Sequence, residues 1–334
     1  MTPSQDIPLC CVVAGTGSIG TRHLRLLGRQ PGVTALALPM RAERRRELQA
    51  EGFEVAASWD EARERGATHA VIATNTGRHR DEAALALSAG CHVLVEKPMA
   101  PDAATAREMA LAAEDAGKGL WVGCNLRFQA ALNRFRERLP DIGRVHAVRI
   151  ECQSYLPDWR PSRPYRHSYS ARADEGGVLR DLIHEIDYAG WLFGWPRAVE
   201  GKTANRGVLD IDADEEADLL WETACGATVS IRLDYLTRPT RRRMTATGEL
   251  GTLAWDGVCG TVTASLATGA EAAETFSQIA DDMYVAQAAA FLSASSRAHD
   301  PRLTTADEGI RALAICDAVR CSSGSGREEL VASS

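Results

Sequence analysis

A lysine between a carboxylate and a proline, in Glu96-Lys97-Pro98, is the first place in the sequence where chemistry is expected. It directly follows the apolar run 93–95, which predicts the end of a buried strand. Pro98 has no N–H group to continue a sheet ladder, so the strand must stop where Lys97 appears. Ligands of open parallel sheets bind beyond the carboxyl ends of the strands, and Lys97 is therefore expected to meet one. The alternative is a solvated Glu–Lys pair before a turn.

A glycine-rich segment near the start of the chain predicts a dinucleotide contact. The apolar run 9–14 is typical of a buried parallel strand, and Gly15, Gly17 and Gly20 follow it with G-x-G-x-x-G spacing before an expected helix. The first glycine permits a tight turn, the second lets the backbone approach a pyrophosphate, and the third lets the helix pack on the strand. The cofactor contacts expected here are Gly15, Thr16, Gly17, Ser18, Ile19 and Gly20, at the helix N-terminus.

The end of the second expected strand, at 33–38, bears on the choice between NAD and NADP. An Asp or Glu there would bind the 2′-hydroxyl of NAD, but the chain continues Pro39-Met40-Arg41. An arginine at this point can hold a 2′-phosphate, so NADP is favoured over NAD, with Arg41 as the expected contact. Arg44 to Arg46 are interpreted as the solvated face of a helix.

Other strand ends supply further cofactor contacts. Thr74 and Asn75 follow a strand expected at 69–73 and are predicted to lie beside the nicotinamide ribose. His79 begins the next helix, where it is either a cofactor contact or a packing histidine. Glu96 is expected to buttress its turn or to lie near the same ribose, rather than to transfer a proton.

The order of elements predicts the fold class. Strands and helices alternate up to residue 123, which indicates α/β architecture with a doubly wound parallel sheet. Later segments have the alternating or β-branched pattern of strands, at 145–154, 199–205, 216–222, 228–235 and 242–247. We therefore expect a dinucleotide-binding domain over 1–123 and a substrate-binding and oligomerisation domain over 124–334, whose final helix lies at about 304–322.

Composition excludes several classes of protein. The chain has 334 residues, of which 45% are hydrophobic and 25% charged, as in soluble two-domain proteins. A net charge of −7 without a block of like charge argues against nucleic acid as a partner. No signal segment or membrane-spanning run is recognised, so a cytoplasmic location away from membranes is expected. Nine cysteines without C-x-x-C spacing indicate neither a metal site nor a disulfide framework.

Four motifs in register resemble those of the Gfo/Idh/MocA oxidoreductase family, over nearly the whole chain. The resemblance implies a Rossmann domain joined to an α/β domain whose large, mostly antiparallel open sheet often mediates oligomerisation, here as a homodimer or homotetramer. It also implies a role for Arg127 among the cofactor contacts. The motifs are Gly15-x-Gly17-x-x-Gly20, Glu96-Lys97-Pro98, Asn125-x-Arg127-Phe128, and Gly176-Gly177 with Asp181, His184 and Asp187.

The resemblance implies that Lys97 meets the substrate near the nicotinamide and that His184 completes the site. Oxidation of an alcohol needs a base for the hydroxyl proton, and reduction of the ketone needs an acid. His184 titrates in the right range, and Lys97 can polarise the oxygen or relay the proton. Asp181 or Asp187 can fix the tautomer of His184. In the family this Asp and His are four residues apart, whereas here Asp181 and His184 are three apart. Residues three and four apart both lie on one face of a helix. Asp181 is therefore kept as the expected partner of His184.

A loop over residues 155–169 is expected to select the substrate. From Trp159 through Arg172 it carries four arginines and no acidic residue, which suggests an anionic substrate group, a carboxylate or a phosphate. Aromatic side chains there can stack on a sugar ring. The alternative is that the arginines pair with acids elsewhere or lie in a subunit interface. The expected substrate contacts, besides His184, are Trp159, Arg160, Arg163, Tyr165, Arg166 and Tyr169.

These features predict an NADP- or NAD-dependent oxidoreductase that acts on a hydroxyl or keto carbon of a sugar, cyclitol or nucleotide sugar. One alternative is a redox-neutral hydrolase or epimerase that keeps NAD(P) tightly bound. Another is a non-enzymatic NADP-sensing regulator, which would not need both Lys97 and His184.

Overall fold

The computed structural model describes residues 9–161, 163–295 and 297–332, and it divides the chain into two compact units. Unit 1 contains Met1–Ala100, Ala104–Asn125 and Ala280–Gly309. Unit 2 contains Pro101–Ala103, Leu126–Ile279 and Ile310–Ser334. This division differs from the contiguous boundary at 123/124 that the sequence suggests, because a later segment returns to unit 1.

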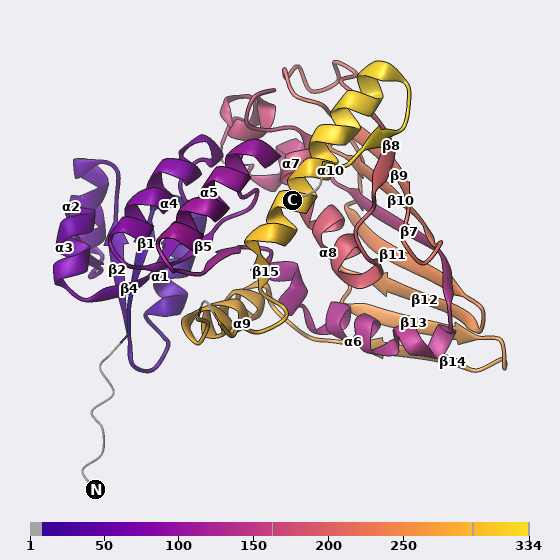
Figure 1. The fold of residues 1–334 in the computed structure, drawn as a ribbon, viewed down its shortest axis with the longest axis horizontal. Helices are drawn as coiled ribbons and strands as arrows, with labels where there is room; N and C mark the ends of the chain where they lie inside the picture. Colours follow the sequence, from indigo (N-terminus) through magenta and orange to yellow (C-terminus); the bar gives the residue numbers. More distant parts are fainter. Residues whose placement is uncertain (1–8, 162, 296, 333–334) are drawn as a thin grey trace, which may run out of the picture. The chain divides into compact units, whose positions relative to one another are not determined.

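Unit 1 is built on a seven-stranded sheet in the order β15-β6-β5-β4-β1-β2-β3 (Figure 1). Its strands are parallel except β15, which pairs antiparallel with β6. Core strands such as β1 are continuously apolar because helices cover both faces of such a sheet. The strands are β1 (Leu9–Ala14), β2 (Val33–Leu38), β3 (Glu54–Val55), β4 (Ala67–Ile72), β5 (His92–Val95), β6 (Leu120–Val122) and β15 (Thr304–Thr305).

The helices of unit 1 include one from the C-terminal half of the sequence. They are α1 (Ser18–Leu27), α2 (Ala42–Ala50), α3 (Trp59–Glu64), α4 (His79–Ser88), α5 (Ala103–Asp115) and α9 (Ala280–Leu292). Arg22 of α1 forms an ion pair with Asp281 of α9, with Nε and Oδ1 3.1 Å apart. The side chain of Gln30 also donates to the carbonyl oxygen of Val285, at 3.3 Å. These contacts attach α9 to the end of α1.

Unit 2 contains a nine-stranded, mostly antiparallel sheet in the order β14-β13-β12-β11-β7-β10-β9-β8-β16. Only β7 and β10 pair in parallel among its described strands. The sequence predicts five of these strands and misses four, namely the two-residue strand β16 and the short hairpin strands β12 to β14. The strands are β7 (Val145–Gln153), β8 (Ala198–Ala204), β9 (Glu216–Glu222), β10 (Thr228–Asp234), β11 (Arg241–Gly248), β12 (Gly251–Asp256), β13 (Thr261–Leu266), β14 (Glu271–Thr275) and β16 (Glu329–Leu330).

Helices of unit 2 pack on one face of this sheet. α8 (Ile183–Phe193) contacts β7 and β10, α7 (Val178–Asp181) contacts β9 and β10, and α6 (Ala130–Arg138) contacts β12 and β13. α10 (Ala306–Ser325) lies against β8, where the N–H of Gly201 donates to the Ser322 hydroxyl at 2.9 Å. Along each strand, buried apolar residues such as Ile150 and Ile231 alternate with polar ones. The sheet therefore has one apolar, covered face and one polar face.

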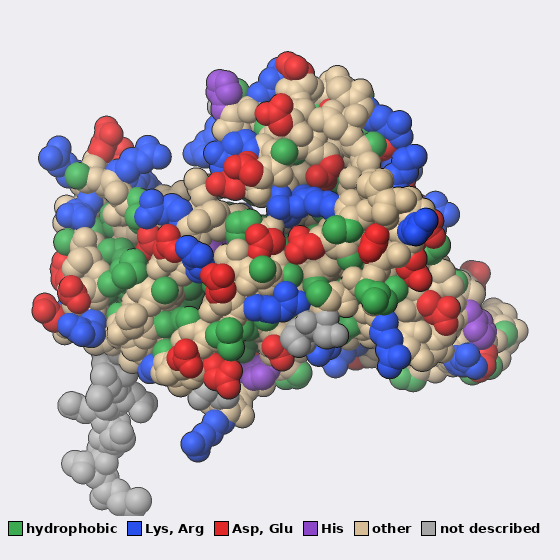
Figure 2. All heavy atoms as spheres, turned by 45° about the horizontal axis from the view of Figure 1, so that its top comes forward, with side chains coloured by type: hydrophobic (Ala, Val, Ile, Leu, Met, Phe, Trp, Pro, Cys, Tyr) green, Lys and Arg blue, Asp and Glu red, His purple; other side chains and the backbone are tan. Residues whose placement is uncertain are grey.

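Charges of both signs are interspersed over the face drawn in Figure 2, in keeping with a modest net charge of −7. Within the described ranges, no helix combines the length and the apolar character that crossing a membrane requires.

Candidate functional site

The glycine segment joins the end of β1 to the first turn of α1. Gly15 has φ +86°, and a Cβ atom there would lie 2.6 Å from backbone atoms of Ala73 and Thr74. A Cβ atom on Gly20 would lie 1.8 Å from the carbonyl oxygen of Gly15. At Gly17, no heavy atom of the described residues other than its chain neighbours lies within 4 Å of such a Cβ. The loop is closed against its own backbone but open at Gly17, the position whose backbone can approach a phosphate.

Arginines of α2 lie at the end of β2. Arg41 is the N-cap residue of α2 and is exposed. Arg44 turns toward the glycine segment: its Nε donates to the carbonyl oxygen of Thr16 at 3.4 Å, and its Nη2 donates to the hydroxyl of Thr21 at 3.2 Å. The sequence interpretation placed Arg44 on a solvated helix face. In the structure it is half-buried, and its Nη1 also pairs with Glu47 at 2.8 Å and with Glu51 at 3.1 Å.

A cavity of about 630 Å³ opens beside the end of β2. The Nε atom of Arg45 is buried there without a hydrogen-bond partner among the described residues. Trp59 Nε1 donates to Glu82 Oε2 at 3.3 Å, and Arg78 pairs with the other oxygen of Glu82 at 2.9 Å. Apolar walls with a spare donor and a buried carboxylate suit the adenosine half of a dinucleotide. The lining residues are Leu38, Pro39, Met40, Arg45, Ala57, Ser58, Trp59, Asp60, Arg63, Arg78, Glu82, Leu85, Ser88 and Ala89.

The connection after β4 contains Thr74, Asn75 and His79. The Thr74 hydroxyl is buried and has no hydrogen-bond partner within the described part of the chain. His79 is only 1% exposed; its Nε2 lies 3.1 Å from the carbonyl oxygen of Thr74, and its Nδ1 lies 3.0 Å from that of Pro98. Burial lowers the pKa of His79. His79 is therefore a packing histidine that ties β4 to the turn after β5, the second of the two alternatives left by the sequence.

Glu96 and Lys97 directly follow β5, and Glu96 is held by a histidine of α1. Nε2 of His23 lies 2.8 Å from Oε1 of Glu96, and the His23 ring packs edge-on against Tyr284. The other carboxylate oxygen of Glu96 accepts the N–H of Lys97 at 3.2 Å. Glu96 thus buttresses the turn that presents Lys97. Sequence reasoning did not identify His23. Its position three residues after Gly20, on the buried side of α1, is the sequence feature that could have indicated it.

In unit 2, a helix break separates Asp181 from His184. Asp181 is the last residue of α7 and His184 is the second residue of α8. Leu182 lies between the two helices with φ −99° and ψ 30°, outside helical geometry. The expectation that both side chains share one face of a single helix is therefore wrong, because two helices carry them. His184 is 8% exposed.

Two tyrosines surround the carboxylate of Asp181. The hydroxyl of Tyr235 donates to Oδ2 of Asp181 at 2.7 Å. The charge of Asp181, together with burial, raises the pKa of Tyr169. Burial and Asp181 likewise raise the pKa of Tyr235. Both hydroxyls stay protonated at neutral pH and can donate to Asp181. Sequence reasoning missed Tyr235, which comes from the residue after β10 and has no local motif.

Arg127 is a buried anchor and lacks the surface position expected of a cofactor contact. Its side chain is 0% exposed. Nε and Nη2 donate to the two carboxylate oxygens of Asp187 at 2.9 and 2.7 Å, a bidentate ion pair. The guanidinium also lies over the ring of Trp191, 5.2 Å from its centroid. Asp187 is thus held by Arg127.

The arginines of this loop differ in whether they have an acidic partner. Arg166 forms an ion pair with Asp210 at 3.3 Å and stacks on Tyr165, as the alternative interpretation of the loop requires. Arg160 and Arg163 are exposed. The negative charge of Asp181 is the main cause of the raised pKa of Tyr169, and the positive charge of Arg160 acts to lower that pKa.

Trp159 connects this loop to the carboxylate site of unit 2. Its Nε1 donates to the Ser154 hydroxyl at 2.9 Å. Its ring packs edge-on against Tyr235, with centroids 5.4 Å apart. The loop expected to bind substrate is therefore attached to the tyrosine that holds Asp181.

Two family models match the chain. One, described as an oxidoreductase family with an NAD-binding Rossmann fold, matches residues 9–124; the other, a Gfo/Idh/MocA C-terminal domain, matches residues 139–254. Together they account for more than half of the sequence. The first match thus identifies an NAD-binding fold in unit 1.

Curated relatives match over parts of their length. The chain is 37% identical over 123 residues to a 1,5-anhydro-D-fructose reductase of Ensifer adhaerens, which covers 35% of this chain and 34% of the relative. It is 32% identical over 188 residues to a myo-inositol dehydrogenase of Streptomyces leeuwenhoekii, covering 54% of this chain and 55% of the relative. The chain thus spans about a third of one relative and about half of the other.

A solved structure of a levoglucosan dehydrogenase in complex with NADH has the same fold. It aligns with a TM-score of 0.86 at 19% identity, over 98% of this chain and 100% of that one. At this identity the likeness shows the fold alone.

Gly17→Ala is expected to weaken NAD(P) binding while the fold stays intact. The backbone φ of −70° suits alanine and the methyl group meets open space, but it occupies the approach of a phosphate. Calorimetric titration with NADH and NADPH should show a Kd that is higher by about tenfold or more, which corresponds to a binding free energy weaker by ~1.4 kcal/mol. The Tm should not change. Gly324→Ala, in open space on α10, is the control and should leave Kd unaltered. An unchanged Kd for Gly17→Ala would contradict this site.

Asp187→Ala is expected to lose about 3–5 kcal/mol of unfolding free energy, because it removes the carboxylate that holds the buried Arg127 guanidinium in a bidentate ion pair. The double variant Arg127→Met/Asp187→Leu removes both charges and should recover most of that loss. Urea denaturation measures both. Arg134→Met, which breaks an exposed pair with Glu274, is the control and should cost less than about 1 kcal/mol. A double variant as unstable as Asp187→Ala would show that the pair is not the cause.

Proposed function

Because this chain belongs to the Gfo/Idh/MocA family of NAD-binding oxidoreductases, we propose that it transfers a hydride between a nicotinamide cofactor and a hydroxyl or keto carbon of a sugar, cyclitol or nucleotide sugar. The observation that carries the proposal is the presence in one chain of a glycine loop that is open at Gly17 and of Lys97 on a buttressed turn after β5. Two relatives, a 1,5-anhydro-D-fructose reductase and a myo-inositol dehydrogenase, support the substrate class.

Lys97 and His184 handle the proton in this proposal. The bound cofactor supplies or accepts the hydride. Lys97 polarises the substrate oxygen, and His184 accepts the hydroxyl proton during oxidation or returns it during reduction. Asp181, whose carboxylate accepts a hydrogen bond from the hydroxyl of Tyr235, precedes α8 and keeps its place in the proposal as the carboxylate that orients His184.

The substrate carries an anionic group in this proposal, and Arg160 and Arg163 bind it. Both are exposed, whereas Arg166 already has an acidic partner. Trp159, Tyr165 and Tyr169 supply aromatic faces for a sugar ring.

NADP is the proposed cofactor, and Arg41 and Arg44 bind its 2′-phosphate. The segment after β2 offers no acid for a ribose 2′-hydroxyl, and the Arg44 guanidinium lies beside the glycine segment. Thr74 and Asn75 contact the nicotinamide ribose.

The protein is proposed to be a cytoplasmic homodimer or homotetramer that associates through the polar face of the nine-stranded sheet. A sheet with one uncovered face is suited to an isologous interface. All nine cysteines are free, as in a reducing compartment.

Lys97→Met and His184→Gln are each expected to reduce turnover by about 10²–10⁴-fold, because each removes a group that handles the proton. Formation of reduced cofactor, followed by absorbance with a panel of sugars, cyclitols and nucleotide sugars, measures the effect. The Kd for NADPH should stay within about threefold. Lys118→Met, on another part of unit 1, is the matched control and should keep full turnover. Wild-type turnover without net reduced cofactor would instead indicate a redox-neutral reaction.

Arg41→Ala and Arg44→Ala are expected to raise the Kd for NADPH by about ten- to a hundredfold and to change the Kd for NADH little, because only NADPH carries the 2′-phosphate. Fluorescence titration of the nicotinamide measures both constants. Arg46→Ala, exposed on the same helix, is the control and should change neither. Tighter binding of NADH than NADPH by the wild-type protein would overturn the NADP assignment.

A further inference from the structure

The polar face of the nine-stranded sheet carries a row of alternating charges. Strand pairing places six side chains side by side across six neighbouring strands, in the signs negative, positive, negative, positive, negative, positive. In order from β12 to β8, the charge row consists of Asp256, Arg243, Glu151, Arg232, Asp218 and Lys202.

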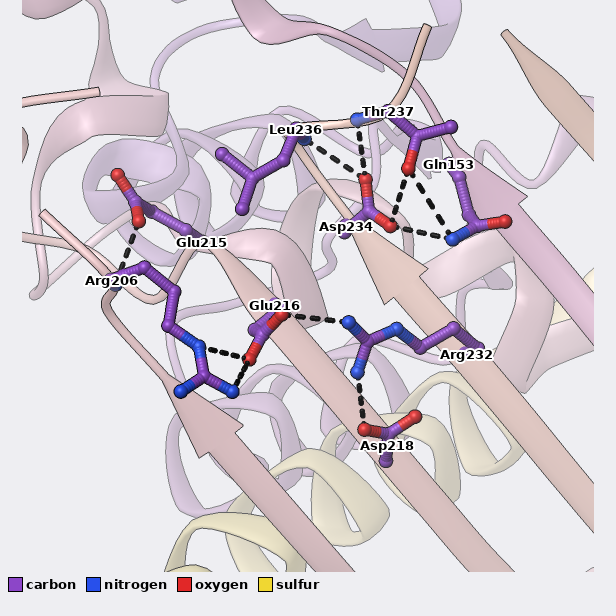
Figure 3. Close-up of polar contacts among 9 residues, drawn as sticks. All are labelled: Gln153, Arg206, Glu215, Glu216, Asp218, Arg232, Asp234, Leu236 and Thr237. Atoms are coloured by element: carbon purple, nitrogen blue, oxygen red, sulfur yellow. Dashed lines mark hydrogen bonds and ion pairs between the residues drawn. The ribbon is translucent and has the colours of Figure 1, made fainter. Parts of the chain in front are cut away.

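Ion pairs within the chain already link members of the charge row. Arg243 Nε lies 2.9 Å from Asp256 Oδ2, and Arg232 pairs with Asp218 (Figure 3). Figure 3 also shows Arg232 bound to Glu216, at 2.7 Å. The side chains of Asp218 and Arg243 nevertheless remain 58% and 59% exposed. They can therefore take a second partner of opposite charge.

A row of six alternating charges is complementary to its own reversed copy. A two-fold axis that runs parallel to the strands, between β7 and β10, reverses the row and sets each charge against an opposite one. Glu151 then faces the partner's Arg232, Arg243 faces the partner's Asp218, and each contact occurs twice. A two-fold axis along the row itself would instead set every charge against its own copy, which is unfavourable.

The neighbouring row of the same face agrees with this axis. Arg241, Gln153, Asp234 and Glu216 are aligned on adjacent strands. Under the same two-fold rotation, Arg241 faces the partner's Glu216, and Gln153 faces the partner's Asp234. This row brings no like charges together.

We propose that the charge row is a self-recognition surface whose occupant is the charge row of a second copy of this chain. This inference rests on the proposed homo-oligomer. It adds the position of the two-fold axis and the pairs of residues that face each other across it. Each charge of the row is matched by one position of the partner, so the pairing is set residue by residue.

Charge reversal on the full-length protein tests the pairing. Asp218→Lys and Arg243→Glu each create two like-charge contacts across the axis and should each raise the dimer Kd at least about tenfold, measured by analytical ultracentrifugation. An equimolar mixture of the two variants restores both contacts, so heterodimers should form with a Kd near that of the wild type. The double variant should also regain a homodimer. Arg63→Glu, exposed on α3, is the control and should leave the Kd unchanged.

The outcomes separate this inference from the proposals before it. A wild-type protein that is monomeric at all concentrations would overturn the homo-oligomer and the charge row together, with hydride transfer tested independently by the turnover assay. A dimer insensitive to both single reversals, or singles that fail to complement each other, would overturn the charge row alone. Circular dichroism and Tm identify any variant that fails to fold, and the complementing mixture keeps the test valid because both chains carry a single change.

Discussion

Two buried ion pairs determine where α8 lies. Asp187 is bound by Arg127, and the neighbouring Glu185 is bound by Arg242 of β11 with Nε and Oε1 2.8 Å apart. Burial raises the pKa of Glu185, and the charge of Arg242 opposes that effect. A buried charge that loses its partner costs several kcal/mol, so α8 cannot slide or rotate without separating a pair. His184 directly precedes Glu185, so the same two pairs also fix the position of its backbone.

Unit 1 achieves the same rigidity mainly through its backbone. Gly15 and Gly20 approach other backbone atoms so closely that no Cβ atom could be accommodated. The two ring nitrogens of His79 lie 3.0 and 3.1 Å from carbonyl oxygens after β5 and β4, where the neutral ring donates to one of them, and His23 fixes the carboxylate of Glu96. The elements that carry Thr74 and Lys97 are thereby tied to one another.

The sequence predicted those features whose causes are local. The glycine spacing, the strand that ends at Lys97, and five of the strands of unit 2 follow from short-range pattern, and the structure has each of them. The ion pair of Arg127 was not predictable, because its partner lies 60 residues away and a motif does not show which way a side chain points. Tyr235 reaches Asp181 across 54 residues for the same reason. The return of α9 to unit 1 depends on contacts with α1, which no pattern within residues 280–292 reveals.

The polar face of the sheet shows why an interface can be specific without being apolar. In the single chain, Arg243 is paired with Asp256 and Arg232 with Asp218 on adjacent strands, and Glu151 is paired with Arg149 of its own strand. In the proposed dimer, each charged side chain gains a second neighbour of opposite charge. These contacts contribute modest affinity, but a misaligned partner would bring like charges together and is strongly disfavoured. A second copy of this chain supplies the reversed sign pattern, so the row favours association between copies of this chain.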